Sequence, residues 1–142
     1  DPAIFAIGDC AKVAGEARRE SWHYANHSAR VVAARITAHP RPKPEPRWFW
    51  SVQGASRVQM LGECPEGAVQ IVRQTGRGQS CLFLSGAMLV GCVAIDTPRD
   101  IAEARKVMAS RRALDLDRIR DLKVPLSQAL LDAREAVANY PA

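Results

Sequence analysis

The fold is decided by residues 68–95, AVQIVRQTGRGQSCLFLSGAMLVGCVAI, in which apolar segments alternate with turns that contain glycine. Three segments, 68–73, 80–84 and 88–95, have the apolar content and the length of β-strands. The turns between them, at 75–78 and 85–86, are short enough to join antiparallel neighbours. This stretch therefore predicts an antiparallel meander.

A helix is predicted directly after the meander. Thr97 is placed to cap it, Pro98 suits its first turn, and Asp100 follows three residues after the cap. Sheet and helix are expected to share a core that contains Leu82, Leu84, Leu89, Val93, Ile101 and Val107. A further helix is predicted at about 127–139, after Val124-Pro125.

Ahead of the meander, the segment WFWSVQ (48–53) predicts another strand. Trp48 and Trp50 would lie on one face of it and Phe49 on the other, because side chains alternate along a strand. Such a face can be ordinary core, or it can cover a planar ligand or contact a partner. The segment HPRPKPEPR (39–47), with proline at every second position, is stiff and free of helix, so it is interpreted as a connector. The expected organisation is a first part at 1–39, a linker at 40–47 and a second part at 48–142.

The first part opens with Asp1-Pro2-Ala3-Ile4-Phe5-Ala6-Ile7-Gly8-Asp9. The apolar run 4–7 is typical of a strand buried on both faces of a parallel sheet. Gly8-Asp9 would then lie at its carboxyl end, where α/β sheets bind ligands, although a plain turn is the other interpretation. Because the sequence begins inside this run, it resembles the C-terminal portion of a longer protein.

A helix is predicted from Ser21, which can act as its cap. Its apolar side would hold Trp22, Ala25, Ala29, Val32, Ala33 and Ile36. His23 and His27, one turn apart, face away from that side and could hold a metal, but without a third ligand a solvated face is favoured. Arg30 and Arg35 also face away from it.

The composition excludes several classes of protein. The formal net charge is +5, with 20 Lys and Arg against 15 Asp and Glu, and no block of like charge stands out as it would in a nucleic-acid-binding chain. A mild positive field suits an acidic protein or an anionic cofactor better. The four cysteines form no CxxC pair, so no metal site is expected, and they fit a reducing cytoplasm. No apolar run approaches the ~20 residues of a membrane span.

Several of these segments together resemble the C-terminal end of the FAD-dependent ferredoxin reductases that serve bacterial oxygenases, the putidaredoxin reductase and biphenyl dioxygenase reductase type. The matching pieces are IFAIGDCA (4–11), ESW (20–22), WFWS (48–51), VGCVA (90–94) and TPRDI (97–101). The resemblance implies an α+β chain. The last strand and helix of an FAD-binding α/β domain would be followed by a C-terminal reductase domain built of an antiparallel sheet and a helix.

The resemblance also implies roles for particular residues. Asp9, after Gly8, would hydrogen-bond the ribityl chain of FAD, and the first turn of the next helix, with Trp22, would meet the pyrimidine end of the flavin. A helix start favours the negative charge of a reduced flavin. Trp48 is expected to pack nearer the flavin ring, and Trp50 to contact an iron–sulfur ferredoxin.

Arg30 is interpreted either as a contact to an acidic ferredoxin or as a solvated charge. NAD(P)H and most of the FAD site would belong to the rest of the reductase chain. Val52 stands where that family usually has Asp, and Asp96 where it usually has Asn. The competing interpretation is an interaction module without activity in isolation, which packs against a partner or forms a homodimer.

Overall fold

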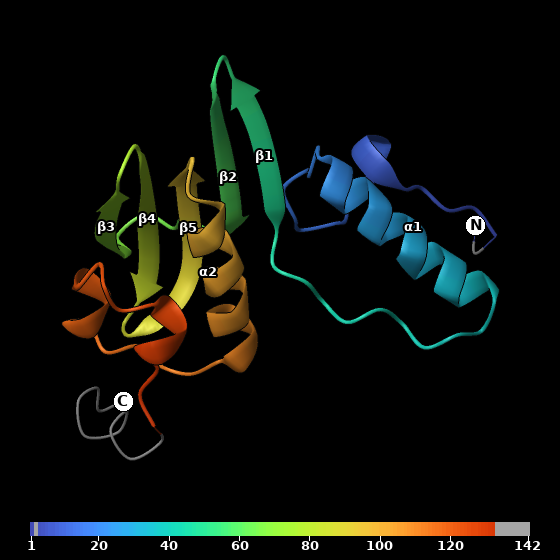
Figure 1. Ribbon diagram of the computed structural model, residues 1–142. Helices are drawn as coiled ribbons and strands as arrows, with labels where there is room; N and C mark the ends of the chain where they lie inside the picture. Colours follow the sequence, from blue (N-terminus) through green and yellow to red (C-terminus); the bar gives the residue numbers. More distant parts are fainter. Residues whose placement is uncertain (2, 133–142) are drawn as a thin grey trace. The chain divides into compact units, whose positions relative to one another are not determined.

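The computed structural model describes residue 1 and residues 3–132. The chain forms two compact units, Asp1–Phe49 and Trp50–Ala142. Figure 1 labels the helices α1 and α2 and the strands β1–β5. The elements are α1 (Trp22–Ile36), β1 (Trp48–Gln53), β2 (Ser56–Gly62), β3 (Val69–Thr75), β4 (Gly78–Ser85), β5 (Met88–Ile95) and α2 (Pro98–Ser110), with 3-10 turns at Gly8–Cys10, Arg118–Arg120 and Leu126–Gln128.

The second unit is built on a five-stranded sheet in the order β1-β2-β5-β4-β3, which confirms the α+β fold. Strands β3, β4 and β5 form the predicted antiparallel meander. Strand β2 pairs antiparallel with β5. The sequence analysis did not predict β2, because the face that it buries carries Gln59 beside Leu61 while Met60 stays exposed. That mixture hides the apolar alternation of a half-buried strand.

One face of the sheet forms the core with α2. Ile71, Leu82, Cys92 and Leu61 are successive partners across four strands, and all four are buried. Ile101, Ala104 and Val107 of α2 are buried in the same unit. Of the six predicted core residues, five are buried.

Val93 is the exception, since it is only half-buried. The register between β4 and β5 shifts from Phe83 paired with Gly91 to Leu84 paired with Leu89, which leaves Val90 as an extra residue. A β-bulge of this kind inverts the alternation of faces beyond it. Leu89 is therefore in the core before the bulge, and Cys92 and Ala94 take the core positions after it in place of Val93.

Gly91 also allows a close approach between strands. A Cβ atom at Gly91 would lie 1.9 Å from the carbonyl oxygen of Glu63, and real Cβ atoms do not come so close to another heavy atom. The Glu63 N–H donates to the Val90 carbonyl at 2.8 Å in the same place. Glycine is required there so that the end of β2 can pair beside the bulge.

The start of α2 is as predicted, but the side chains that fix it act differently. Thr97 is the N-cap residue and Pro98 the first helical residue. The Thr97 hydroxyl donates to the Gln79 carbonyl at 3.3 Å, and buried Asp100 accepts a bond of 2.5 Å from the Ser80 hydroxyl. Both side chains therefore join the helix to β4, and neither caps its backbone.

The segment after α2 covers the open end of this core. Leu114, Ile119, Leu126, Ala129 and Leu131 are buried. Buried Arg73 of β3 holds the segment by donating to the carbonyls of Ile119, Asp121 (3.3 Å) and Val124 (2.9 Å). The helix predicted at 127–139 is wrong over its described part, because a single 3-10 turn ends at Gln128 and Leu130 pairs with Leu114 in an antiparallel bridge. Residues 133–139 lie outside the described residues.

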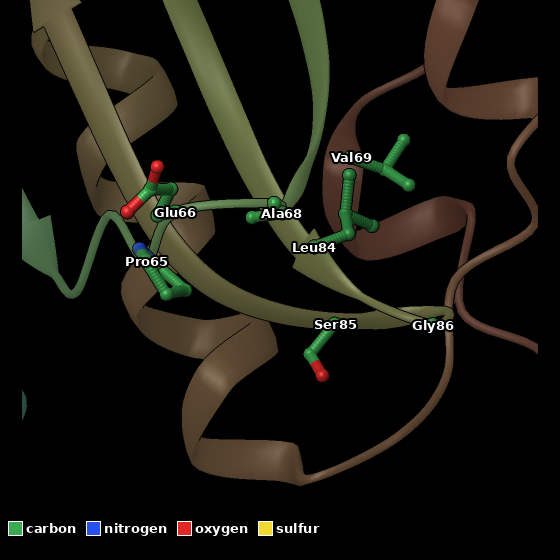
Figure 2. A pocket seen from close by; sticks show the side chains of 8 residues that line it. Pro65, Glu66, Ala68, Val69, Leu84, Ser85 and Gly86 are labelled. Atoms are coloured by element: carbon green, nitrogen blue, oxygen red, sulfur yellow. The ribbon is translucent and has the colours of Figure 1, made fainter.

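A shallow hollow lies between the loop at 65–69 and the turn at 84–86 (Figure 2). Glu66 is the only ionisable side chain that lines it. The hollow therefore offers no acid–base pair and no cluster of ligating groups. We do not place the candidate site there.

Candidate functional site

The Gly8-Asp9 turn lies against helix α1 within the first unit. The Gly8 N–H donates to the Ser28 hydroxyl at 3.0 Å, and that hydroxyl donates to the Ala25 carbonyl at 3.0 Å. Gly8 is buried and has a φ of +68°, a conformation that other residues adopt only with strain. A side chain has room there, since an added Cβ would meet the Ala25 Cβ at 3.5 Å. Backbone conformation, rather than crowding, is therefore why glycine is needed at this position.

Asp9 follows on an exposed 3-10 turn. Within the described part of the chain, no hydrogen bond or ion pair involves its carboxylate. A carboxylate held on a fixed turn and not bound elsewhere in this unit can accept bonds from the hydroxyl groups of a ligand.

The strand expected at 4–7 is wrong. Ile4 is 75% exposed, and residues 4–7 form no strand in the structure. A buried strand needs a neighbour for its N–H and carbonyl groups, and the described residues of the first unit provide none. The Phe5 ring instead lies beneath the Arg35 guanidinium, 5.2 Å from ring centre to Cζ. The Gly-Asp turn is thus held by α1 and not by a sheet.

Helix α1 begins where the sequence predicted. The Ser21 hydroxyl accepts from the Tyr24 N–H at 3.1 Å, which is the expected cap, and Trp22 is the first helical residue. The first backbone N–H groups of a helix have no carbonyl partner within it, so this end favours negative charge. The predicted apolar side is not buried, because Trp22 is 62% exposed and Ile36 is 67% exposed.

Trp48 lies beside the first turn of α1. The His23 ring meets it edge-on, with centroids 6.3 Å apart and planes at 84°. His23 Nε2 also lies 3.1 Å from Glu45 Oε2. The expectation that His23 forms part of a solvated face is therefore wrong, since its side chain is only 16% exposed and is bonded. Among the described residues no cluster of three His, Cys, Asp or Glu side chains could hold a metal ion.

Arg30 is exposed on α1, and its positive charge acts on Glu45. The hydrogen bond from His23 holds the pKa of the Glu45 carboxyl below its usual value, and the positive charges of His23, Arg30 and His27 act in the same direction. Arg30 is thus accompanied by a negative side chain and does not form an isolated positive patch. Trp50 is half-buried on β1 and belongs to the second unit. The predicted pairing of Trp50 with Arg30 stays a prediction.

Sequence reasoning missed two residues that organise this region, Ser28 and Glu45. A signal for Ser28 was present, because serine inside a helix often bonds to backbone. Glu45 is the only acidic residue of the segment 39–47. Its partner could not be read from the sequence, because 22 residues separate it from His23.

The class of domain is an α+β module, formed by the sheet, helix α2 and the covering segment. In the sequence it follows a glycine–aspartate turn and a capped helix. The family described as Reductase C-terminal matches residues 48–130. The chain belongs to this family, which confirms the resemblance drawn from the sequence.

Several known proteins are similar to this chain. Terpredoxin reductase of a Pseudomonas species is 40% identical over 92% of this chain. The ferredoxin–NAD(+) reductase component of the p-cumate 2,3-dioxygenase system of Pseudomonas putida is 33% identical over 88% of the chain. The crystal structure of the covalent putidaredoxin reductase–putidaredoxin complex covers 91% of the chain at 27% identity, with a TM-score of 0.79. The chain spans about a third of the length of each.

None of the described helices has the length and the apolar content that a membrane span requires.

Proposed function

We propose that this chain is the C-terminal part of an FAD-dependent reductase that passes electrons from NAD(P)H through FAD to a ferredoxin. The observation that carries the proposal is the family match over 48–130, preceded by a Gly-Asp turn fixed on a capped helix. The names of the relatives, a ferredoxin–NAD(+) reductase component among them, support the same activity. We assign each segment of the chain a role, with the boundaries proposed from its sequence. Residues 1–39 complete an FAD domain, residues 40–47 link the two domains, and residues 48–142 form the reductase domain.

The residues present fit a flavin. A free carboxylate on a rigid turn suits the ribityl hydroxyls, and the capped start of α1 suits the pole of the ring that gains negative charge. Bound FAD supplies the conversion of a two-electron donor into single-electron transfers. Gly8 sets the turn, Asp9 binds and orients the ribityl chain, and the backbone at Trp22 stabilises charge at the pyrimidine end.

The aromatic residues of β1 have the partner-facing roles in this proposal. Trp48 covers the ring side and excludes water, and Trp50 is the anchor for the ferredoxin. Arg30 draws an acidic partner, with Glu45 moderating its charge. Interfaces concentrate binding energy in tryptophan and arginine, which is why these residues are assigned to the partner.

Replacing Asp9 tests the cofactor assignment. In the reductase with its upstream domains, Asp9→Ala removes a charge-assisted hydrogen bond and should weaken FAD binding about ten- to a hundredfold. Asp9→Asn keeps a hydrogen-bond acceptor, so it should weaken FAD binding less. Flavin content is measured by absorbance near 450 nm, and Asp117→Ala, on an exposed turn of the second unit, is the control. If Asp9→Ala retains the flavin content of the wild type, Asp9 is only part of a turn and does not bind FAD.

Replacing Trp50 tests the partner assignment. Trp50→Ala should slow reduction of the ferredoxin by roughly tenfold or more, while reduction of a small artificial acceptor stays near wild type. Rising salt should slow ferredoxin association and leave flavin reduction by NAD(P)H nearly unchanged. Equal losses with both acceptors would place Trp50 in the flavin pocket or the core.

One observation favours the second candidate, an interaction or dimerisation module without activity of its own. The face of the sheet that carries Met60, Val93, Cys81 and Val72 in one cross-strand row is apolar, and Met60 and Val72 are exposed. Exposed apolar patches mark contact surfaces. Purified reductase that shows no 450 nm absorbance even after incubation with FAD would favour this candidate over the first.

A further inference from the structure

One imidazole links three segments of the first unit. His23 belongs to the first turn of α1, its Nε2 bonds Glu45 Oε2 at 3.1 Å, and its ring edge meets Trp48, the first residue of β1. The contact with Trp48 is T-shaped, with an interplanar angle of 84°, a favoured arrangement for aromatic rings. From the first turn of α1, His23 therefore contacts both the connector at Glu45 and the side chain of Trp48.

The connector is suited to being fixed at one point. Proline occupies positions 40, 42, 44 and 46, so the segment is stiff and extended. Glu45 lies three residues before Trp48, and a bond at Glu45 limits where a stiff chain can place that tryptophan. A flexible linker would transmit no such restraint.

The groups around Glu45 favour its contact with α1. His23, Arg30 and His27, all on α1, each lower the pKa of the Glu45 carboxyl. The hydrogen bond from His23 is the largest influence that lowers the pKa of Glu45. The carboxylate is thus charged near neutral pH and accepts the imidazole N–H.

We propose that His23 is a positioning residue for Trp48, and that its bond to Glu45 clasps the proline connector onto the first turn of α1. The importance of this clasp for electron transfer rests on the proposed function, in which Trp48 covers the flavin. The clasp itself is a property of the chain alone.

The clasp depends on the charge of Glu45, because a hydrogen bond to an ionised carboxylate is stronger than one to a neutral group. The pKa of the Glu45 carboxyl is lowered in the folded chain. The contribution of Glu45 is therefore present above the ordinary value of 4.5 and is lost as pH falls through the lowered value.

The test follows the indole N–H signal of Trp48 by NMR in the 142-residue chain, as pH is lowered from 7 to 3. The signal should move as the Glu45 carboxylate gains its proton in the wild type, and it should stay still in Glu45→Gln, which has no carboxylate. It should also stay still in His23→Gln, which keeps the carboxylate but removes the ring that links it to Trp48. His39→Gln is the matched control, since it removes another histidine from this region and should leave the titration unchanged.

A second readout measures opening of the connector. Trypsin does not cleave before proline, so Arg41 and Lys43 are protected and Arg47–Trp48 is the susceptible bond of the segment 39–47. His23→Gln should raise cleavage there about two- to fivefold, the range for loss of one partly exposed polar contact.

A wild-type Trp48 signal that does not follow pH, or one that still titrates in His23→Gln, would overturn the clasp. Neither measurement needs a flavin or a ferredoxin. Failure here therefore leaves the proposed function standing, whereas absence of flavin from the longer reductase would leave the clasp standing.

Discussion

Residues 50–132 bury a continuous apolar layer between a sheet and a helix, whereas Gly8 and Ala11 are the buried residues among the described positions of 1–49. The first unit is held instead by polar and ring contacts: Gly8 to Ser28, His23 to Glu45, and Arg35 over Phe5. Apolar burial is the main source of folding stability. The second unit therefore carries most of the folding stability of the chain, while the first sets the geometry of the candidate site.

The largest effect should come from the sheet core. Leu82 is fully buried between Ile71 and Cys92, so Leu82→Ala should lower the free energy of unfolding by about 2–5 kcal/mol through lost contacts and a cavity. Ile4→Ala, at an exposed position of the first unit, should change it by less than about 0.5 kcal/mol. Urea denaturation measures both. Equal losses would mean that the second unit does not carry most of the stability.

A smaller effect is expected at the buried cation of β3. Arg73→Met keeps much of the length but removes the donors to the carbonyls of Ile119, Asp121 and Val124, at a cost of about 1.5–3 kcal/mol. Faster hydrogen exchange at 118–124 should accompany it. Arg77→Met, on the exposed β3–β4 turn, is the matched control. Unaltered exchange at 118–124 would mean that apolar packing alone holds the covering segment.

The smallest effect should depend on pH. Glu103 of α2 accepts bonds from the Ser127 hydroxyl and N–H, and these lower the pKa of its carboxyl. A lowered pKa contributes stability above the ordinary value of 4.5, and the contribution is lost as pH falls through the lowered value. Glu103→Gln should therefore lower the free energy of unfolding by about 1 kcal/mol at pH 7 and by progressively less below pH 4.5.

Glu66→Gln, in the exposed loop before β3, should show no such convergence. If Glu103→Gln lowers the free energy of unfolding as much below pH 4 as at pH 7, the cause is shape rather than charge. In that case packing, and not the charge of Glu103, holds Ser127 to α2.

The local features of the chain could be predicted from the sequence. Strands β3–β5, the start of α2 at Thr97-Pro98 and the Ser21 cap of α1 were all readable, because apolar period, turn residues and capping residues act within a few positions. The order of matching segments was enough to predict the family. The Gly8-Asp9 turn was also visible, although its support was not.

Features that depend on distant partners became visible in the folded chain alone. The bulge at Val90 exchanged Val93 for Cys92 in the core, and residues 4–7 formed no strand without a neighbour to pair with. Ser28 meets Gly8 across 20 residues, and Glu45 meets His23 across 22. Arg73 reaches the chain 46 to 51 residues further on. Such pairings are set by how the backbone folds back on itself, because a polar side chain bonds to whatever group the fold brings within about 3 Å, and no local pattern records which group that is.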